Sequence, residues 1–277
     1  MKKYVQRHRH AAAGPWQWFF RAKDALQPLL SRGSFAMDRL SLILKKDDVE
    51  LLHSETDAVE FEVTCINLLR RPEKKRFMEK QFEGTGWTMH FFPAIDGLTI
   101  NVPQLISDGI LAEDNFCPAT AMALIPAQIG VYLSHYELWK MALLSPNKIS
   151  LILEDDALLI CDMPQLEAFA RHIPDDADLF FINHRQNKTR PVSLYASKFT
   201  GRFWGLTAYF ITRKGAEKLV NLMLPIHKSA DEAINGLSKS GAITCYCSRK
   251  ELVVECSNSR DERNFRFESD IISRTKE

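Results

Sequence analysis

The chain lacks the long apolar runs, paired cysteines and glycine-rich loops that mark several large classes of protein. Among its 277 residues, no apolar run approaches the ~18 residues of a membrane span, so we expect a chain that does not cross a bilayer. The six cysteines include no CxxC pair, and Cys245 and Cys247 alone are weak evidence for a metal site. We interpret the cysteines as free thiols in a reducing compartment. Without a GxGxxG or Walker loop, the sequence supports neither a dinucleotide site nor a P-loop.

Positive charge is concentrated at the N-terminal end. Ten Lys or Arg and two acids give residues 1–46 a net charge of +8, which leaves −7 for the rest of a chain whose total is +1. Trp16, Phe19 and Phe20 fall roughly on one face of a predicted helix with basic residues around it. We predict that residues 1–57 are a basic and aromatic N-terminal arm with a linker, and that this arm contacts an anionic membrane surface peripherally.

Other interpretations of the arm are a helix packed on the remaining domain or a disordered leader. Nucleic acid is the other anionic candidate, but one basic cluster without a binding module argues for it weakly, so we expect no nucleic-acid partner. A secretory signal is not expected, because the apolar core is too short and too interrupted. We therefore expect a cytoplasmic location, at the inner face of the cytoplasmic membrane.

A short run of branched apolar residues after Lys148 ends in three consecutive acids. The run predicts a buried strand of a parallel sheet, and ligands of α/β proteins bind outside the carboxyl ends of such strands. Side chains alternate along a strand, so Glu154 and Asp156 should point to one side and Asp155 to the other. Two converging carboxylates repel each other unless a cation lies between them, and Mg²⁺ or Mn²⁺ takes such oxygen ligands. The alternative is a solvated acidic turn.

Two further segments carry candidate site residues. Residues 59–68 alternate as a strand, and the basic residues Arg70 and Arg71 follow it, before a helix that opens on Pro72; such a strand end suits a phosphate or a nucleotide. Residues 126–144 have the periodicity of a well-buried helix with His135 beside its apolar face. A packed, hydrogen-bonded histidine and a functional one both remain open.

The rest of the chain alternates between strands and helices. We predict strands at 87–92, 178–183, 206–211, 242–246 and 252–255, and helices at 163–173 and 213–220, the latter capped by Thr212. Ser229 to Glu232 matches a capping box, which makes Glu232 structural and leaves Asp231 freer to act. Asp96 with Gly97 has the default interpretation of a turn. The alternation of strands and helices along the chain predicts an α/β fold with a mostly parallel central sheet flanked by helices.

Several sequence pieces then coincide in order and spacing: Ile66-Asn67-Leu68 with Arg71, Ala94-Ile95-Asp96-Gly97, Gln128 to His135 with Trp139, Ile152 to Asp156, Gly205 to Tyr209 leading into Arg213 to Ala216, and Ser269-Asp270-Ile271. Together they resemble glycosyltransferase family 25, the bacterial lipooligosaccharide β-galactosyltransferases, whose relatives include the collagen galactosyltransferases. The resemblance covers about residues 60 to 272. This sequence departs from the family pattern at Gln128 and Val131, where many members carry Glu and Cys, and at Leu206, which lies inside the Gly-Thr pair.

The resemblance implies a GT-A-type nucleotide-diphospho-sugar transferase fold in residues 58–277. It also implies inverting, metal-dependent transfer of a hexose, galactose as a rule, from a UDP-sugar to a hydroxyl of a lipooligosaccharide, lipopolysaccharide or other glycan. We assign the roles as follows: Glu154 and Asp156 to Mn²⁺ or Mg²⁺; Asn67, Arg70, Arg71, Asp155 and Thr207 to the UDP-sugar; Asp231, and Asp96 as second choice, to the catalytic base; and His135 to catalysis or to orienting the diphosphate.

Two other functions compete with this one. A metal-dependent nucleotidyltransferase shares a nucleotide-binding sheet and an acidic metal motif, but the sequence shows no glycine-rich basic loop near the first strand to hold a triphosphate. A non-catalytic carbohydrate-binding or membrane-tethered scaffold would keep the fold without the transfer reaction.

Overall fold

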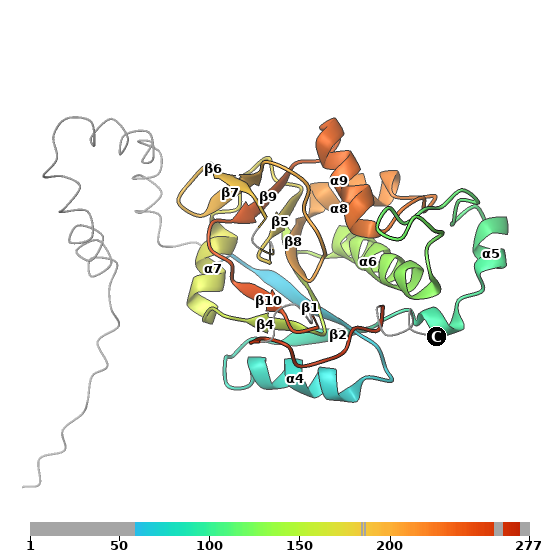
Figure 1. Cartoon of the computed structure of the whole chain (residues 1–277). Coiled ribbons are helices and arrows are strands. Elements are labelled where there is room, and N and C mark those ends of the chain that lie inside the picture. The colour runs from blue at the N-terminus through green and yellow to red at the C-terminus, as the bar shows by residue number, and fades with distance from the viewer. Residues whose placement is uncertain (1–58, 184, 186, 258–262, 272–277) are drawn as a thin grey trace, which may run out of the picture. The chain divides into compact units, whose positions relative to one another are not determined.

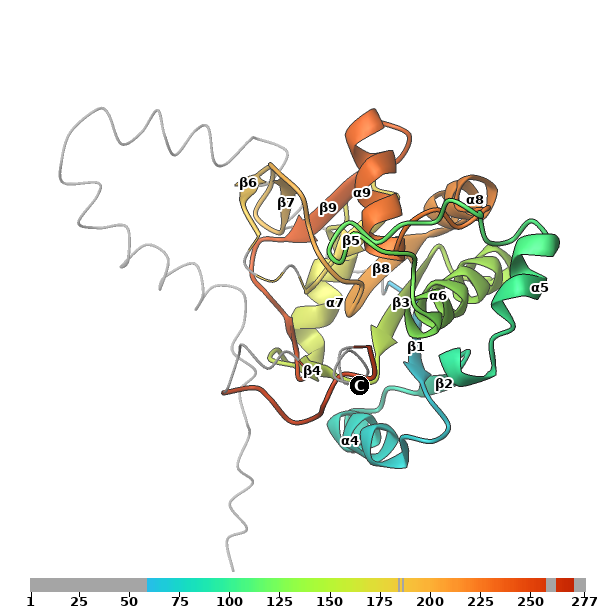
Figure 2. The same ribbon diagram turned by 45° about the vertical axis from the view of Figure 1, so that its right-hand side comes forward.

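The computed structural model describes residues 59–183, 185, 187–257 and 263–271, which form an α/β domain (Figures 1 and 2). The predicted N-terminal arm, residues 1–57, lies outside the described residues, so its membrane contact stays a prediction. In the described part of the chain, no helix has the length and apolar character needed to cross a bilayer.

The central element is an eight-stranded sheet in the order β2-β1-β3-β8-β5-β9-β7-β6. Its strands are β1 (Phe61–Asn67), β2 (Met89–Pro93), β3 (Ile149–Glu154), β5 (Leu179–Phe181), β6 (Thr189–Pro191), β7 (Ala196–Phe199), β8 (Ala208–Thr212) and β9 (Cys245–Ser248). Neighbouring strands β2, β1 and β3 are parallel, as are β5 and β9, whereas β8 and β7 run against their neighbours. A separate two-stranded ribbon pairs β4 (Ala157–Leu159) with β10 (Val253–Glu255). The predicted α/β architecture is confirmed, with a sheet that is mixed.

Helices cover both faces of the sheet. Helices α4 (Pro72–Phe82) and α7 (Met163–Arg171) lie on one face, and α6 (Pro126–Leu144), α8 (Arg213–Leu222) and α9 (Ala230–Ser240) lie on the other (Figures 1 and 2). Each face has its own hydrophobic core, because successive strand side chains point to opposite sides. On β3, for example, Leu151 and Leu153 pack toward α4 while Ile152 packs toward α6.

Local signals placed most of these elements correctly. The prolines at 72, 126 and 164 each stand at the first or second position of a helix, where a missing backbone N–H costs nothing. Thr212 caps α8 by accepting a hydrogen bond from the backbone N–H of Gly215 at 3.0 Å, as predicted. The structure adds α5 (Val102–Ser107), the short 3-10 helix η2 (Gly97–Thr99) and the β6–β7 hairpin, in stretches for which no element was predicted.

The capping box predicted at Ser229 is wrong. The Ser229 side chain makes no cap bond, and its hydroxyl donates instead to Oδ1 of Asp231 at 2.8 Å. The Glu232 side chain does not reach back to the start of α9, because it forms an ion pair with Arg202. The motif marks the correct helix start, but Ser229 bonds to Asp231 and Glu232 pairs with Arg202 of a distant loop.

A close helix contact fixes the loop that follows β2. A Cβ atom on Gly130 would lie 2.4 Å from the carbonyl oxygen of Ile95, so α6 approaches this loop at a distance that no other residue allows. The backbone N–H of Ile95 donates to Ser134 Oγ at 2.9 Å. The contact places Asp96, at the start of η2, beside the carboxyl ends of β1 and β3.

Candidate active site

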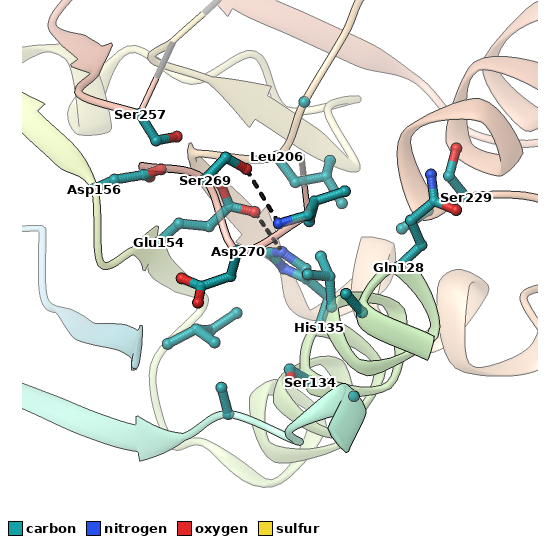
Figure 3. Close-up of a pocket in the computed structure, with 18 of the residues that line it drawn as sticks. Gln128, Ser134, His135, Glu154, Asp156, Leu206, Ser229, Ser257, Ser269 and Asp270 are labelled. Carbon is teal, nitrogen blue, oxygen red and sulfur yellow. Dashed lines mark hydrogen bonds and ion pairs between the residues drawn. The ribbon is translucent and has the colours of Figure 1, made fainter. Parts of the chain in front are cut away.

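A cavity of 760 Å³ opens where the carboxyl ends of β1 and β3 meet the loop before β8 and the start of α9. Its lining includes Arg70, Lys74, Asp96, Gln128, His135, Glu154, Asp155, Asp156, Trp204, Asp231 and Asp270. Figure 3 shows Glu154, Asp156 and Ser257 on one wall, with Gln128 and Ser229 on the opposite side. Such a mixture of acids and cations around a cavity of this size suits a charged, hydroxyl-rich ligand.

The acidic motif diverges as strand alternation predicts. Glu154 faces α6, where its Oε1 lies 3.2 Å from Nε2 of His135. Asp155 faces α4, where Oδ1 lies 3.0 Å from Nζ of Lys74 and Oδ2 accepts a hydrogen bond from the Asn67 amide at 2.9 Å. Burial alone would lower the pKa of Lys74, but the charges of Asp155 and Asp156 raise it. The Lys74–Asp155 pair is therefore a buried ion pair.

His135 belongs to a buried chain of hydrogen bonds that ends on Glu154. The Trp139 indole N–H, which can only donate, lies 2.9 Å from the Tyr209 hydroxyl oxygen. The Tyr209 oxygen therefore accepts this bond, and its own proton can be donated to Nδ1 of His135 at 2.9 Å. This assigns the remaining ring proton to Nε2, from which His135 donates to Glu154 (Figure 3). Burial would raise the pKa of Glu154, but the hydrogen bond from His135 holds it below its ordinary value, and the charges of Arg185 and Lys74 act in the same direction.

Asp156 has the least compensated charge of the three acids. It is 7% exposed, and its Oδ1 has no hydrogen-bond partner among the described residues. Burial, followed by the charge of Glu154, raises the pKa of Asp156 to about 7, and the charge of Glu255 acts in the same direction. A divalent cation would relieve this repulsion, so the donor set fits one.

The described residues include no group of three or more His, Cys, Asp or Glu placed to hold a metal ion. A Mg²⁺ ion is commonly bound through one or two carboxylates, with substrate phosphates and water completing its shell. Glu154 and Asp156 can supply such a partial set, and the metal assignment stays a prediction.

Three cations gather at the end of β1 around a single carboxylate. Arg70 Nη1 lies 2.7 Å from Oδ1 of Asp270, and Arg71 and Lys74 both approach Oδ2. Burial would raise the pKa of Asp270, but its hydrogen bonds to the two arginines keep it below its ordinary value. Asp270 was noted in the sequence only as part of a motif, and its partner role was not predicted.

Two candidate bases, Asp96 and Asp231, are engaged by hydrogen bonds from other residues. Asp96 accepts a hydrogen bond from the backbone N–H of Leu98 at 3.0 Å and pairs with Arg70 Nε at 2.7 Å, so it is a turn residue as its default interpretation holds. Asp231 accepts from Ser229 and from two backbone N–H groups, those of Glu232 and Gly205. Asp231 therefore has structural contacts and also lines the cavity, and its role as the base stays a prediction.

Three predicted donor-binding residues do not line the cavity. Asn67 is 4% exposed and holds Asp155, while Arg71 pairs with Glu73 and Asp270. Thr207 is 1% exposed, and its backbone carbonyl oxygen accepts a hydrogen bond from the Glu154 N–H at 2.8 Å. Asn67 and Thr207 therefore hold residues of the acidic motif in place. Direct contact of Asn67, Arg71 and Thr207 with a ligand stays a prediction.

Comparison with known proteins places this site in a family. The family model described as glycosyltransferase family 25 (LPS biosynthesis protein) matches residues 61–234. A glycosyltransferase 25 family member of Drosophila melanogaster is 38% identical over 95 residues, which are 34% of this chain and 16% of that protein. The procollagen galactosyltransferase 1 of Danio rerio is 26% identical over 231 residues, which are 74% of this chain and 37% of that protein.

The chain thus spans well under half of the length of these relatives. Among solved structures, a Drosophila β1,4-galactosyltransferase 7 mutant in complex with manganese, UDP-Gal and xylobiose aligns with a TM-score of 0.35 at 10% identity, over 79% of this chain and 80% of that one.

Proposed function

Because the chain belongs to glycosyltransferase family 25, we propose that it transfers a hexose from a UDP-sugar, with galactose as the first candidate, to a hydroxyl group of a glycan. The acceptor class we propose is a lipooligosaccharide or lipopolysaccharide. The observation that supports this function is the meeting of an acidic motif and a cation cluster at one 760 Å³ cavity at the carboxyl ends of β1 and β3. The α/β architecture agrees with the GT-A-type fold expected for the family.

The cation cluster and the acidic motif would each have a separate role in release of the diphosphate. Arg70 and Lys74 line the cavity on the α4 side and would bind phosphate oxygens there, because guanidinium and ammonium groups donate charge-assisted hydrogen bonds. Glu154 and Asp156 would hold a Mg²⁺ or Mn²⁺ ion, which when bound neutralises charge developing on the leaving diphosphate. The buried hydrogen-bond chain through His135 keeps Glu154 ionised and oriented.

The acceptor hydroxyl needs a base on the face opposite the leaving group if the transfer inverts configuration. We propose Asp231 for this role and Asp96 as second choice. Both line the cavity. The hydrogen bonds that hold Asp231 fix its position beside the cavity, which is compatible with the role. We place His135 as a residue that positions Glu154.

The test is a panel of UDP-sugars, with release of UDP as the measurement, in Mn²⁺ or Mg²⁺ and in EDTA. We expect one or a few UDP-hexoses to give metal-dependent UDP release. Asp156→Asn should lower that turnover at least about 100-fold, since it removes a metal-binding charge while keeping the shape of the side chain. The matched control is Asp176→Asn, because Asp176 bonds to Tyr246 away from the cavity and should retain full turnover.

Near-normal turnover of Asp156→Asn would contradict the metal assignment. Binding of UDP-galactose without transfer to any acceptor and without hydrolysis would favour the non-catalytic scaffold. Release of pyrophosphate from a nucleoside triphosphate and a sugar phosphate would identify a nucleotidyltransferase.

A further inference from the structure

The loop of residues 202–205, just before β8, is fastened to the first turns of α9 at several points. The Asn235 amide donates to the carbonyl oxygen of Phe203 at 2.6 Å and accepts from the Phe203 N–H at 3.0 Å. Asp231 accepts from the N–H of Gly205 at 3.1 Å, and Glu232 forms an ion pair with Arg202. Three polar side chains of one helix are therefore committed to holding this loop.

Adjacent aromatic residues of this loop have opposite environments. Phe203 is 2% exposed and packs on Phe181 and Phe199, with ring centroids 4.7 and 4.6 Å away. Trp204 is 40% exposed and lines the cavity. The backbone then turns at Gly205, whose φ of +76° is one that glycine adopts without strain. The anchored Phe203 and this turn together hold Trp204 at the cavity wall.

The orientation of the Trp204 ring is also restrained. The Arg202 guanidinium lies over the ring, 4.4 Å from its centroid, in a cation–π contact. Arg202 is in turn held by Glu232. A ring fixed in this way loses little conformational entropy when a ligand stacks on it, which favours binding.

We propose that Trp204 is the platform on which the pyranose ring of the acceptor sugar stacks. A pyranose has a flat patch of C–H groups bordered by hydroxyls, so it fits an apolar aromatic surface beside polar groups. Asp231, Ser229 and Gln128 line the same cavity and can exchange hydrogen bonds with hydroxyls.

The position of Trp204 favours the acceptor over the donor. Of the cations that line the cavity, Arg70 and Lys74 come from the β1–α4 side of the sheet, and Arg185 is paired with Glu255. The loop of Trp204 is held by α9, which packs on the other face. A diphosphate bound at Arg70 and Lys74 would leave the Trp204 ring available to the second substrate, which is the acceptor. This inference rests on the proposed function.

The first experiment measures sugar binding at Trp204 directly, with the 277-residue chain labelled with ¹⁵N in its five tryptophans. The Trp204 indole signal is assigned by its absence in Trp204→Phe. With UDP and Mg²⁺ saturating, methyl β-D-galactopyranoside, methyl β-D-glucopyranoside and methyl β-D-xylopyranoside are each added to about 100 mM, which saturates sites of millimolar Kd. We expect at least one sugar to shift the Trp204 signal while the buried Trp139 signal stays in place.

The proposal is overturned if none of the three sugars shifts the Trp204 signal. It is also overturned if UDP alone shifts that signal and the sugars add nothing, because Trp204 would then stack on the nucleobase. Neither result depends on catalytic turnover. Absence of UDP release from every UDP-sugar would instead contradict the proposed function, and the titration would still decide the role of Trp204.

The second experiment separates the two substrates kinetically, using the methyl pyranoside that best stimulates UDP release. Trp204→Ala should raise the KM for that sugar about 10-fold or more and leave the KM for the UDP-sugar unchanged, whereas Trp204→Phe should keep most of the affinity. The control is Leu144→Ala, at an 87% exposed apolar residue outside the cavity, which should change neither constant. An unchanged sugar KM in Trp204→Ala, with thermal unfolding like that of the wild type, contradicts the proposal.

Discussion

Asp156 is the side chain of the site whose negative charge is most unfavourable in the folded protein. Its Oδ1 is buried without a hydrogen-bond partner among the described residues, and it shares its surroundings with the charges of Glu154 and Glu255. In the folded protein this carboxyl keeps its proton up to a pH of about 7, whereas in the unfolded chain it loses the proton near pH 4. The residue is therefore a source of pH-dependent instability.

The sign of this dependence follows from proton counting. Between about pH 4 and 7 the folded state binds more protons at Asp156 than the unfolded state does, so the free energy of unfolding falls as the pH rises. We expect Asp156→Asn to be more stable than the wild type by roughly 2–4 kcal/mol at pH 8 in EDTA, and the difference to fade toward pH 4. Urea unfolding at several pH values measures it. A difference that does not vary with pH would contradict the raised pKa.

The choice between two candidate bases is also a question of single residues. Asp231→Asn should lower the rate of transfer about 100-fold or more while leaving the affinity for UDP within about 2-fold, because a base acts on the acceptor hydroxyl and not on the nucleotide. Asp96→Asn should instead weaken UDP binding, since Asp96 holds Arg70. If Asp231→Asn transfers at the normal rate and Asp96→Asn does not, the two assignments must be exchanged.

At the scale of elements, the site depends on how α4 is joined to the end of β3. Lys74 of α4 is 4% exposed, and its ammonium lies between Asp155 and Asp270. Removing one member of a buried ion pair leaves the other charge without its partner, which costs more than the pair itself contributes. The junction between these two elements is therefore sensitive to neutralisation of Lys74.

We expect Lys74→Met to lower the free energy of unfolding by about 3–5 kcal/mol, as measured by urea denaturation. Adding Asp155→Asn to that variant should restore part of the loss, because the orphaned charge is removed. The control is Lys75→Met on the exposed side of α4, where the ion pair with Glu79 is solvated and the loss should stay below about 1 kcal/mol. An equally small loss for Lys74→Met would show that Asp155 finds another partner.

At the scale of the whole molecule, the last described segment returns to the first helix of the domain. Asp270 forms an ion pair with Arg70, which is 200 positions away in the sequence. Its carboxylate therefore contacts a cation that the proposed function assigns to the diphosphate. The two anions would share the same donors. The segment of residues 263–271 is therefore placed to compete with the nucleotide.

Asp270→Asn should strengthen UDP binding several-fold at low ionic strength, because it removes a negative charge next to three cations, and added salt should reduce the gain. Isothermal titration with UDP measures both effects. Glu137→Gln, which removes one negative charge from the exposed surface of α6, should leave the affinity unchanged. Weaker UDP binding by Asp270→Asn would mean that Asp270 orients the arginines for the donor.

Local patterns in the sequence determined most of the elements, the acidic motif and the family. Strand alternation predicted that Glu154 and Asp155 face opposite sides, and a helix cap such as Thr212 could be identified because its partner lies three residues away. These predictions needed only neighbouring residues. The same holds for the helix starts at the prolines, where one ring fixes the backbone angle.

Only the tertiary structure decided which charges and hydrogen bonds are shared. Lys74 and Asp155 are 81 positions apart, His135 and Tyr209 are 74 apart, and Glu232 of the predicted capping box pairs with Arg202, 30 positions away. No periodicity links such partners, because folding brings them together through the packing of different elements. The sequence therefore determined which chemical groups lie at the strand ends, and the packing of α4, α6 and α9 decided which of them face the cavity and which support it.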